Sequence, residues 1–155
     1  MIEASSTIAV NNPDDTETLT RDDVWAGLVE KAENPLPYVR NISECVVAER
    51  FEGGLIRDIV HVGQHVRETV TFYPKSRVHF VRTHGIARGT IDNEISESSD
   101  GTLELTFTFR IVVDGVDAGS AEEGEFASNM KADYLDAVQT TLQAVRDRVA
   151  TSASQ

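Results

Sequence analysis

The chain has 155 residues, 40% hydrophobic and 26% charged, which suits a single globular domain with its own core. Its 26 acidic and 14 basic residues give a formal net charge of −12, which opposes binding to nucleic-acid phosphates or anionic membranes. The single cysteine, Cys45, excludes an intrachain disulfide. Without a secretory signal or a transmembrane-length segment in the sequence, we expect a cytoplasmic protein that does not insert into membranes.

The first forty residues predict one strand followed by one or two short helices. Residues 7–10 form the strand candidate. A capping box follows, in which Thr20 is the N-cap and Asp23 reaches back to it. Apolar residues at helical spacing then predict a helix that ends before Pro35, because proline blocks its continuation. Residues 36–41 allow one further helical turn.

The remainder of the chain predicts a sheet and then one long helix. The expected strands are 42–51, 55–62, 66–73, 77–83, 86–96 and 102–113. Short turns join them, so neighbours should pair antiparallel. A long amphipathic helix at 120–150 comes last, with 152–155 as a frayed tail. The fold class is therefore α+β: one domain over 1–155, with a curved antiparallel sheet of about seven strands wrapped on the long C-terminal helix.

The last strand indicates which face of the sheet is buried. Its apolar residues alternate with polar ones, so the apolar set should face the helix. Strand pairing carries this assignment to the other strands, whose inward positions include polar side chains. These are Glu49, Arg57, His61, Glu68, Arg82 and Asn93. Such groups are costly in a dry core unless they are paired, so a partly wet cavity between sheet and helix explains them. A bulge or a one-residue register slip would reverse any of these assignments.

The inward residues suggest both a catalytic pair and a binding wall. Glu68 with His61 is the candidate pair for general acid–base catalysis. The alternative for Glu68 is a structural ion pair with Arg57 or Arg82. The expected ligand-binding residues are Arg57, Asn93, Arg82, Glu49, Ile91, Phe107, Phe109, Met130 and Tyr134. The histidines lack metal-ligand spacing and no phosphate-binding loop is present, so neither a metal nor a cofactor is expected.

Several segments resemble one protein family. They are Leu19–Leu28, Lys31–Pro35, Glu49–Gly54, Gly89–Ile95 and Gly119–Glu123. In these segments the chain resembles the AtaL-like family, formerly a domain of unknown function, within the SRPBCC or START-like helix-grip superfamily. The resemblance implies a helix-grip fold and a hydrophobic ligand between sheet and helix. Some family members are associated with natural-product gene clusters, and the superfamily includes polyketide aromatases/cyclases and lipid carriers. It shares no catalytic residue set, so none is carried over.

Three functional interpretations fit these observations. The first is an enzyme of small-molecule or natural-product metabolism that binds a small hydrophobic or aromatic molecule and performs cyclase- or dehydratase-like acid–base chemistry. It predicts that Glu68→Gln abolishes turnover while ligand binding and melting temperature stay nearly unchanged. The second is a non-catalytic carrier of a hydrophobic ligand or lipid, and the third is a dimeric or accessory protein whose pocket is incidental. A monomer or a homodimer is expected.

Overall fold

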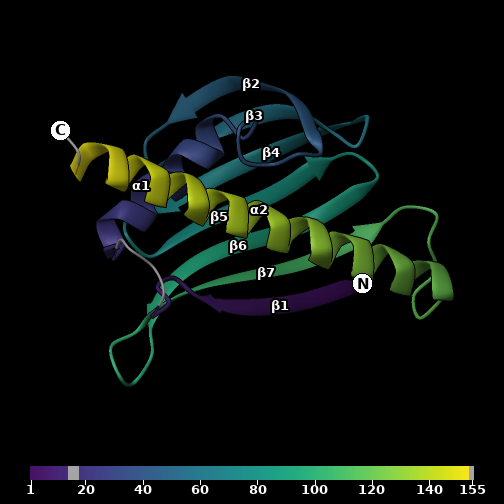
Figure 1. Cartoon of the computed structure of the whole chain (residues 1–155). Coiled ribbons are helices and arrows are strands. Elements are labelled where there is room, and N and C mark those ends of the chain that lie inside the picture. Colours follow the sequence, from purple (N-terminus) through teal and green to yellow (C-terminus); the bar gives the residue numbers. More distant parts are fainter. Residues whose placement is uncertain (14–17, 154–155) are drawn as a thin grey trace.

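An antiparallel sheet of seven strands curves around one long helix in the computed structural model, which describes residues 1–13 and 18–153 (Figure 1). In chain order the elements are β1 (Ile2–Ala9), α1 (Arg21–Glu33), β2 (Ile42–Phe51), β3 (Gly54–His61), β4 (Gln64–Tyr73), β5 (Arg77–His84), β6 (Ala87–Glu97), β7 (Leu103–Val113) and α2 (Ala121–Ala153). The sheet order is β1-β7-β6-β5-β4-β3-β2, so β1 and β2 form its edges. This architecture confirms the predicted α+β class.

The two ends of the chain differ from the predicted bounds. β1 begins five residues before the predicted strand because it pairs along its whole length with β7, from Ile2 opposite Ile111 to Ala9 opposite Glu104. Its serine-rich middle shows little apolar alternation, so the sequence indicated only its last residues. α2 continues to Ala153, so the tail expected at 152–155 is helical at 152–153, and 154–155 lie outside the described residues.

α1 is fixed by its cap and by close contact with α2. The predicted capping box is confirmed: Asp23 N–H donates to Thr20 Oγ1 at 3.2 Å, and Thr20 N–H donates to Asp23 Oδ2 at 2.8 Å. Gly27 faces Val145 of α2 so closely that a Cβ there would overlap its side chain. The missing side chain lets the two helices approach, and this holds the last turn of α1 over the sheet.

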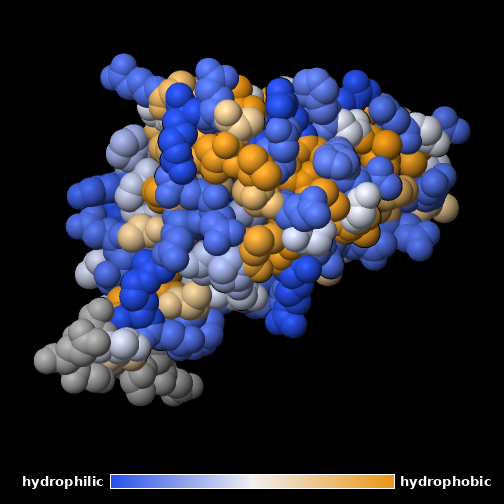
Figure 2. Space-filling view, turned by 90° about the horizontal axis from the view of Figure 1, so that it is seen from above, coloured by the Kyte–Doolittle hydropathy of each residue, from blue (hydrophilic) through white to orange (hydrophobic). Residues whose placement is uncertain are grey.

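The core lies between the inner face of the sheet and α2. The predicted apolar alternation of β7 is confirmed, since Leu105, Phe107, Phe109 and Ile111 are all buried. α2 covers them with an apolar face (Figure 1); its buried hydrophobic residues are Ala137, Val138, Leu142 and Val145. On the surface in Figure 2, hydrophobic residues occur in patches broken by hydrophilic side chains. No described helix is both long and apolar enough to span a bilayer.

A β-bulge in β2 overturns one prediction about the inner face. Val47 lies opposite Arg57 of β3, but Glu49 lies opposite Ile56, so Ala48 is an extra residue between the two pairs. Because one inserted residue reverses the alternation, Glu49 moves to the outer face and is exposed. The prediction that Glu49 points inward is therefore wrong.

We expect Gly89→Ala to lower the free energy of unfolding by about 2 kcal/mol. Gly89 has φ +144°, and a Cβ there would overlap the carbonyl oxygen of Arg110 on β7. Urea denaturation measures the loss. Gly101→Ala is the matched control, because Gly101 also has positive φ (+84°) but a Cβ there would meet no atom within 4 Å. Equal losses in the two variants would contradict a role for the close approach of β6 and β7.

Candidate functional site

A buried carboxylate bridges two buried arginines on the inner face of the sheet. Arg57 of β3 lies opposite Glu68 of β4, which lies opposite Arg82 of β5. Glu68 Oε1 accepts hydrogen bonds from Arg57 Nε (2.9 Å) and Nη2 (2.7 Å), and Oε2 accepts one from Arg82 Nε (2.8 Å). Glu68 is only 1% exposed. The structural ion pair left open for Glu68 by the sequence is thus present, with both arginines.

The last turn of α1 adds a third cation to this cluster. Arg57 Nη1 donates to the main-chain oxygen of Ala32 at 2.9 Å, at the negative end of the helix. Lys31, which is 7% exposed, donates from Nζ to Asn93 Oδ1 on β6. Lys31 was not among the predicted site residues. Its spacing could have identified it as an inward residue, because Val24, Leu28 and Lys31 fall at i, i+4 and i+7 on the apolar face of α1.

The buried charges do not balance. Among the described residues, the buried charged side chains are Lys31, Arg57, Arg82 and Glu68, that is, three cationic groups and one anionic group. Arg57 and Arg82 already use both oxygens of Glu68. A buried excess of positive charge is unfavourable unless a proton leaves or an anion or hydrogen-bond acceptor approaches. In a chain with net charge −12, this region can therefore attract electron-rich groups.

The environment shifts the pKa values of these groups in different directions. Burial opposes ionisation of Glu68, but Arg57 and Arg82 outweigh burial and hold its pKa at about 2. Burial, with repulsion from Arg57, lowers the pKa of Lys31 to about 7, although Glu68 opposes this. Burial and then Arg82 lower the pKa of His61 to about 4. Near pH 7 Glu68 is therefore ionised, His61 is neutral and Lys31 is divided between its two forms.

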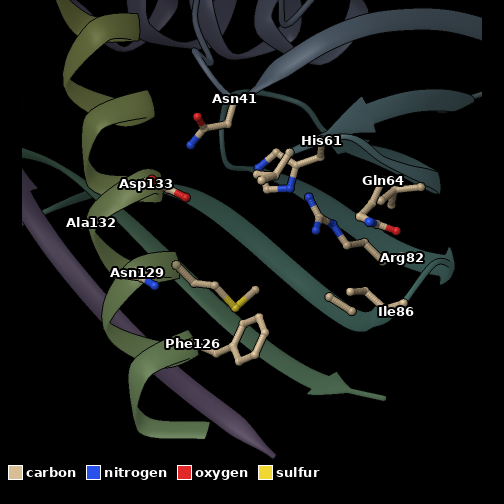
Figure 3. A pocket seen from close by; sticks show the side chains of 13 residues that line it. Asn41, His61, Gln64, Arg82, Ile86, Phe126, Asn129, Ala132 and Asp133 are labelled. Atoms are coloured by element: carbon tan, nitrogen blue, oxygen red, sulfur yellow. The ribbon is translucent and has the colours of Figure 1, made fainter. Parts of the chain in front are cut away.

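Two hollows that share lining residues lie beside the cluster. The larger, of about 510 Å³, opens between α2 and the ends of β3, β4 and β5 (Figure 3). Its apolar walls are Val62, Val66, Ile86, Ala87, Phe126, Met130 and Ala132. The smaller, of about 50 Å³, is reached by Lys31, Glu68, Asn93 and Tyr134. His61 and Arg82 line both. In Figure 3 these two side chains lie next to each other, across from Asn129 and Asp133 of α2.

Tyr134 of α2 lines the smaller cavity and carries an unsatisfied hydroxyl. Its ring packs against Phe109 and Phe107, with centroid distances of 5.1 and 6.4 Å. Its hydroxyl oxygen is buried and has no hydrogen-bond partner among the described residues. A buried hydroxyl without a partner costs about 1–3 kcal/mol, so this group is available to a ligand.

The structure brings most of the predicted site residues together. Arg57, Glu68, Arg82 and Asn93 are buried on the inner face as predicted, and Ile91, Phe107 and Phe109 are buried beside them. Met130 lines the larger pocket, and Tyr134 and Ile91 line the smaller cavity. Glu49 lies apart on the outer face. His61 and Glu68 are not hydrogen-bonded to each other in the described chain, and the catalytic roles assigned to them stay predictions.

Comparisons with known proteins give a family match and a shared fold. The family model described as AtaL, acetylaranotin biosynthesis cluster protein L, matches residues 4–152. No curated protein matches the sequence significantly. The di-domain aromatase/cyclase StfQ of the steffimycin biosynthetic pathway superposes with TM-score 0.75 at 10% identity, over 96% of this chain and 52% of that one.

Two single-domain structures are similar over nearly their whole length. The ZhuI aromatase/cyclase from Streptomyces sp. R1128 gives TM-score 0.64 at 16% identity, over 96% of this chain and 94% of that one. A START superfamily protein from Mycobacterium smegmatis gives TM-score 0.65 at 13% identity, over 92% and 98%. At these identities the likeness establishes the START-like helix-grip fold alone.

Proposed function

The chain belongs to the AtaL family and has the helix-grip fold, and on this basis we propose that it binds a small hydrophobic or aromatic molecule between the sheet and α2. We further propose that it acts on this molecule as an enzyme of small-molecule or natural-product metabolism. The chemistry would be a cyclase- or dehydratase-like acid–base step. The wall of the larger pocket is the observation that carries this proposal.

That wall is mainly apolar, with the nitrogen-rich side chains of Arg82 and His61 on one side and Asn129 and Asp133 of α2 across from them. Phe126, Met130 and Ile86 would contact the body of the ligand. Pockets for small molecules combine apolar walls with a few placed polar groups in this way. The excess of buried cations favours a ligand with a carbonyl, phenolic or carboxylate oxygen at its inner end.

The proposed acid–base chemistry assigns different roles to the two predicted catalytic residues. With a pKa of about 2 and both oxygens occupied, Glu68 is a poor proton acceptor and would instead position the two arginines. Arg82 would then stabilise negative charge that develops on a ligand oxygen. His61, neutral near pH 7, would accept a proton. The positive charge of Arg82 disfavours protonation of His61. An anionic ligand beside Arg82 would offset this repulsion and raise the pKa of His61 toward its ordinary range.

A non-catalytic carrier is the second candidate. Both oxygens of Glu68 already accept hydrogen bonds from the arginines, and this favours a carrier, because a carrier needs the arginines only to hold an electron-rich group of the ligand. The two candidates differ in turnover and agree on ligand binding, so binding is tested first.

We expect the protein to bind 1-anilinonaphthalene-8-sulfonate more tightly than N-phenyl-1-naphthylamine, which has the same rings without the sulfonate. Arg82→Gln should weaken binding of the sulfonate probe about tenfold or more and leave the neutral probe nearly unchanged, because it removes only the charged hydrogen-bond donor. Fluorescence titration measures both affinities.

Arg110→Met is the matched control, since Arg110 is exposed and pairs with Glu3 on the outer face. Near-ultraviolet circular dichroism verifies that each variant is folded at the titration temperature. Failure of the wild type to bind either probe, or equal weakening of both probes in Arg82→Gln, would contradict the proposed pocket.

A further inference from the structure

Lys31 is a buried lysine with no carboxylate partner among residues 1–13 and 18–153. The hydrogen bond of its Nζ goes to Asn93 Oδ1, a neutral acceptor. Glu68, the only buried carboxylate among the described residues, is already held by Arg57 and Arg82. Lys31 and Arg57 also face the same Phe80 ring, with the Lys31 Nζ 6.0 Å and the Arg57 Cζ 5.2 Å from its centroid. The amine is thus desolvated and sits beside another cation.

This environment favours the neutral, nucleophilic form of the amine. Desolvation in an apolar site and a neighbouring positive charge both disfavour the protonated form, and together they activate lysines toward carbonyl compounds. The lowered pKa of Lys31, about 7, agrees with the geometry. Near neutral pH about half of the amine is then unprotonated, against less than about one part in a thousand for an ordinary lysine.

The amine also lines a cavity that shares two of its residues with the pocket proposed for the ligand. Lys31 lines the smaller cavity together with Tyr134, whose buried hydroxyl has no partner in the described part of the chain. His61 and Arg82 line both this cavity and the larger pocket. A cavity of about 50 Å³ has room for a carbonyl group but not for a ring. An aromatic body in the larger pocket could therefore present a carbonyl to the Lys31 amine.

We propose that Lys31 forms an imine with the carbonyl carbon of an aldehyde or ketone ligand. The Nζ lone pair adds to the carbonyl carbon to give a carbinolamine. Loss of the carbonyl oxygen as water, with both amine protons, then leaves a C=N bond, so no oxidant or reductant is consumed. The Tyr134 hydroxyl hydrogen-bonds the departing oxygen. This inference rests on the proposed function, because the same cavity must hold the ligand.

Reductive trapping tests the inference directly. The protein is incubated at pH 7 with 2-naphthaldehyde and sodium cyanoborohydride, and the adduct is located by peptide mass spectrometry. The chain has three lysines, and Lys75 and Lys131 are both exposed and serve as internal references. We expect Lys31 to be modified about tenfold faster than either of them, since its larger neutral fraction outweighs its restricted access. Naphthalene-2-methanol, which lacks the carbonyl, should slow the trapping of Lys31 alone.

Two variants serve as controls for the assignment. Lys31→Arg keeps the charge and the donor to Asn93 but cannot form an imine, so its adduct should be lost while its melting temperature stays close to that of the wild type. The double variant Lys75→Arg/Lys131→Arg should keep the adduct in full. Modification confined to Lys75, Lys131 and the amino terminus, or an undiminished adduct in Lys31→Arg, would overturn the inference.

The trapping result is separable from the proposed function. Tight binding of the naphthyl probes without trapping of Lys31 would overturn the imine and leave the binding pocket standing. Trapping of Lys31 that naphthalene-2-methanol does not slow would place the aldehyde outside the larger pocket. That result would overturn the proposal in its present form, because it requires the ligand body to lie there.

Discussion

Glu68→Gln is expected to lower the free energy of unfolding by about 3 to 5 kcal/mol, because it leaves two buried arginines without their shared carboxylate. The amide can still accept a hydrogen bond, but it carries no charge to offset Arg57 and Arg82. The sequence alone led to the opposite expectation, a nearly unchanged melting temperature. Urea denaturation at pH 7 measures the difference. An unchanged stability would return Glu68 to the role of a catalytic group that is dispensable for folding.

The pH dependence of this difference gives a second signature. The folded pKa of Glu68, about 2, lies below its ordinary value of 4.5, so ionised Glu68 contributes its full stability above about pH 4.5. That contribution is lost as the pH falls through the folded pKa. The difference in the free energy of unfolding between wild type and Glu68→Gln should therefore be constant above pH 5 and shrink toward pH 2. Asp58→Asn is the control, since its pair with Arg67 is exposed and should contribute little.

The sheet could be predicted because each of its strands carries a local signal. β7 alternates apolar and polar residues along its length, which defines the buried face. Short turns then fix the antiparallel neighbours, so the sequence predicts that Arg57, Glu68 and Arg82 share one face, as they do in the structure. Three polar positions on three adjacent strands are enough to predict a cluster, because side chains opposite each other in a sheet must be close.

The rest of the site depends on contacts that the local pattern does not contain. The bulge that turns Glu49 outward inserts one residue into β2, and no glycine or proline marks the position. Lys31 reaches the cluster only because α1 packs on α2 through Gly27. The hydroxyl of Tyr134 is unsatisfied only in the folded chain. Each of these features follows from how the helices sit on the sheet, which a single sequence does not specify.

A cluster with three buried cations and one anion lowers stability, and nothing in the fold requires it. An apolar residue at Lys31 would continue the face formed by Val24 and Leu28. Buried charged groups can often be replaced by apolar residues of similar size without loss of stability, or with a gain. Strained or unfavourable groups of this kind are typical of functional sites, where stability is traded for activity. Replacing one of these buried cations therefore shows how much stability the cluster costs.

Lys31→Met should stabilise the protein at neutral pH, and the gain should fall as the pH rises. The folded pKa of Lys31, about 7, lies below its ordinary value of 10.5, so the penalty of burying the amine is fully present below pH 7. It declines between pH 7 and pH 10.5, because the unfolded chain gradually ceases to bind the extra proton. The stability difference between variant and wild type should thus change by about 3 kcal/mol between pH 7 and pH 10.

At pH 10 we expect the order of stabilities to reverse, since the variant still lacks the donor to Asn93 while the wild type no longer bears the penalty of burying a charged amine. Urea denaturation of both proteins at several pH values measures the change. Lys131→Met, at an exposed position on α2, is the control and should show a nearly constant difference. A pH-independent difference in Lys31→Met would mean that Lys31 keeps an ordinary pKa in the folded protein. In that case Lys31 would be protonated near pH 7, and the neutral amine required for imine formation would be absent.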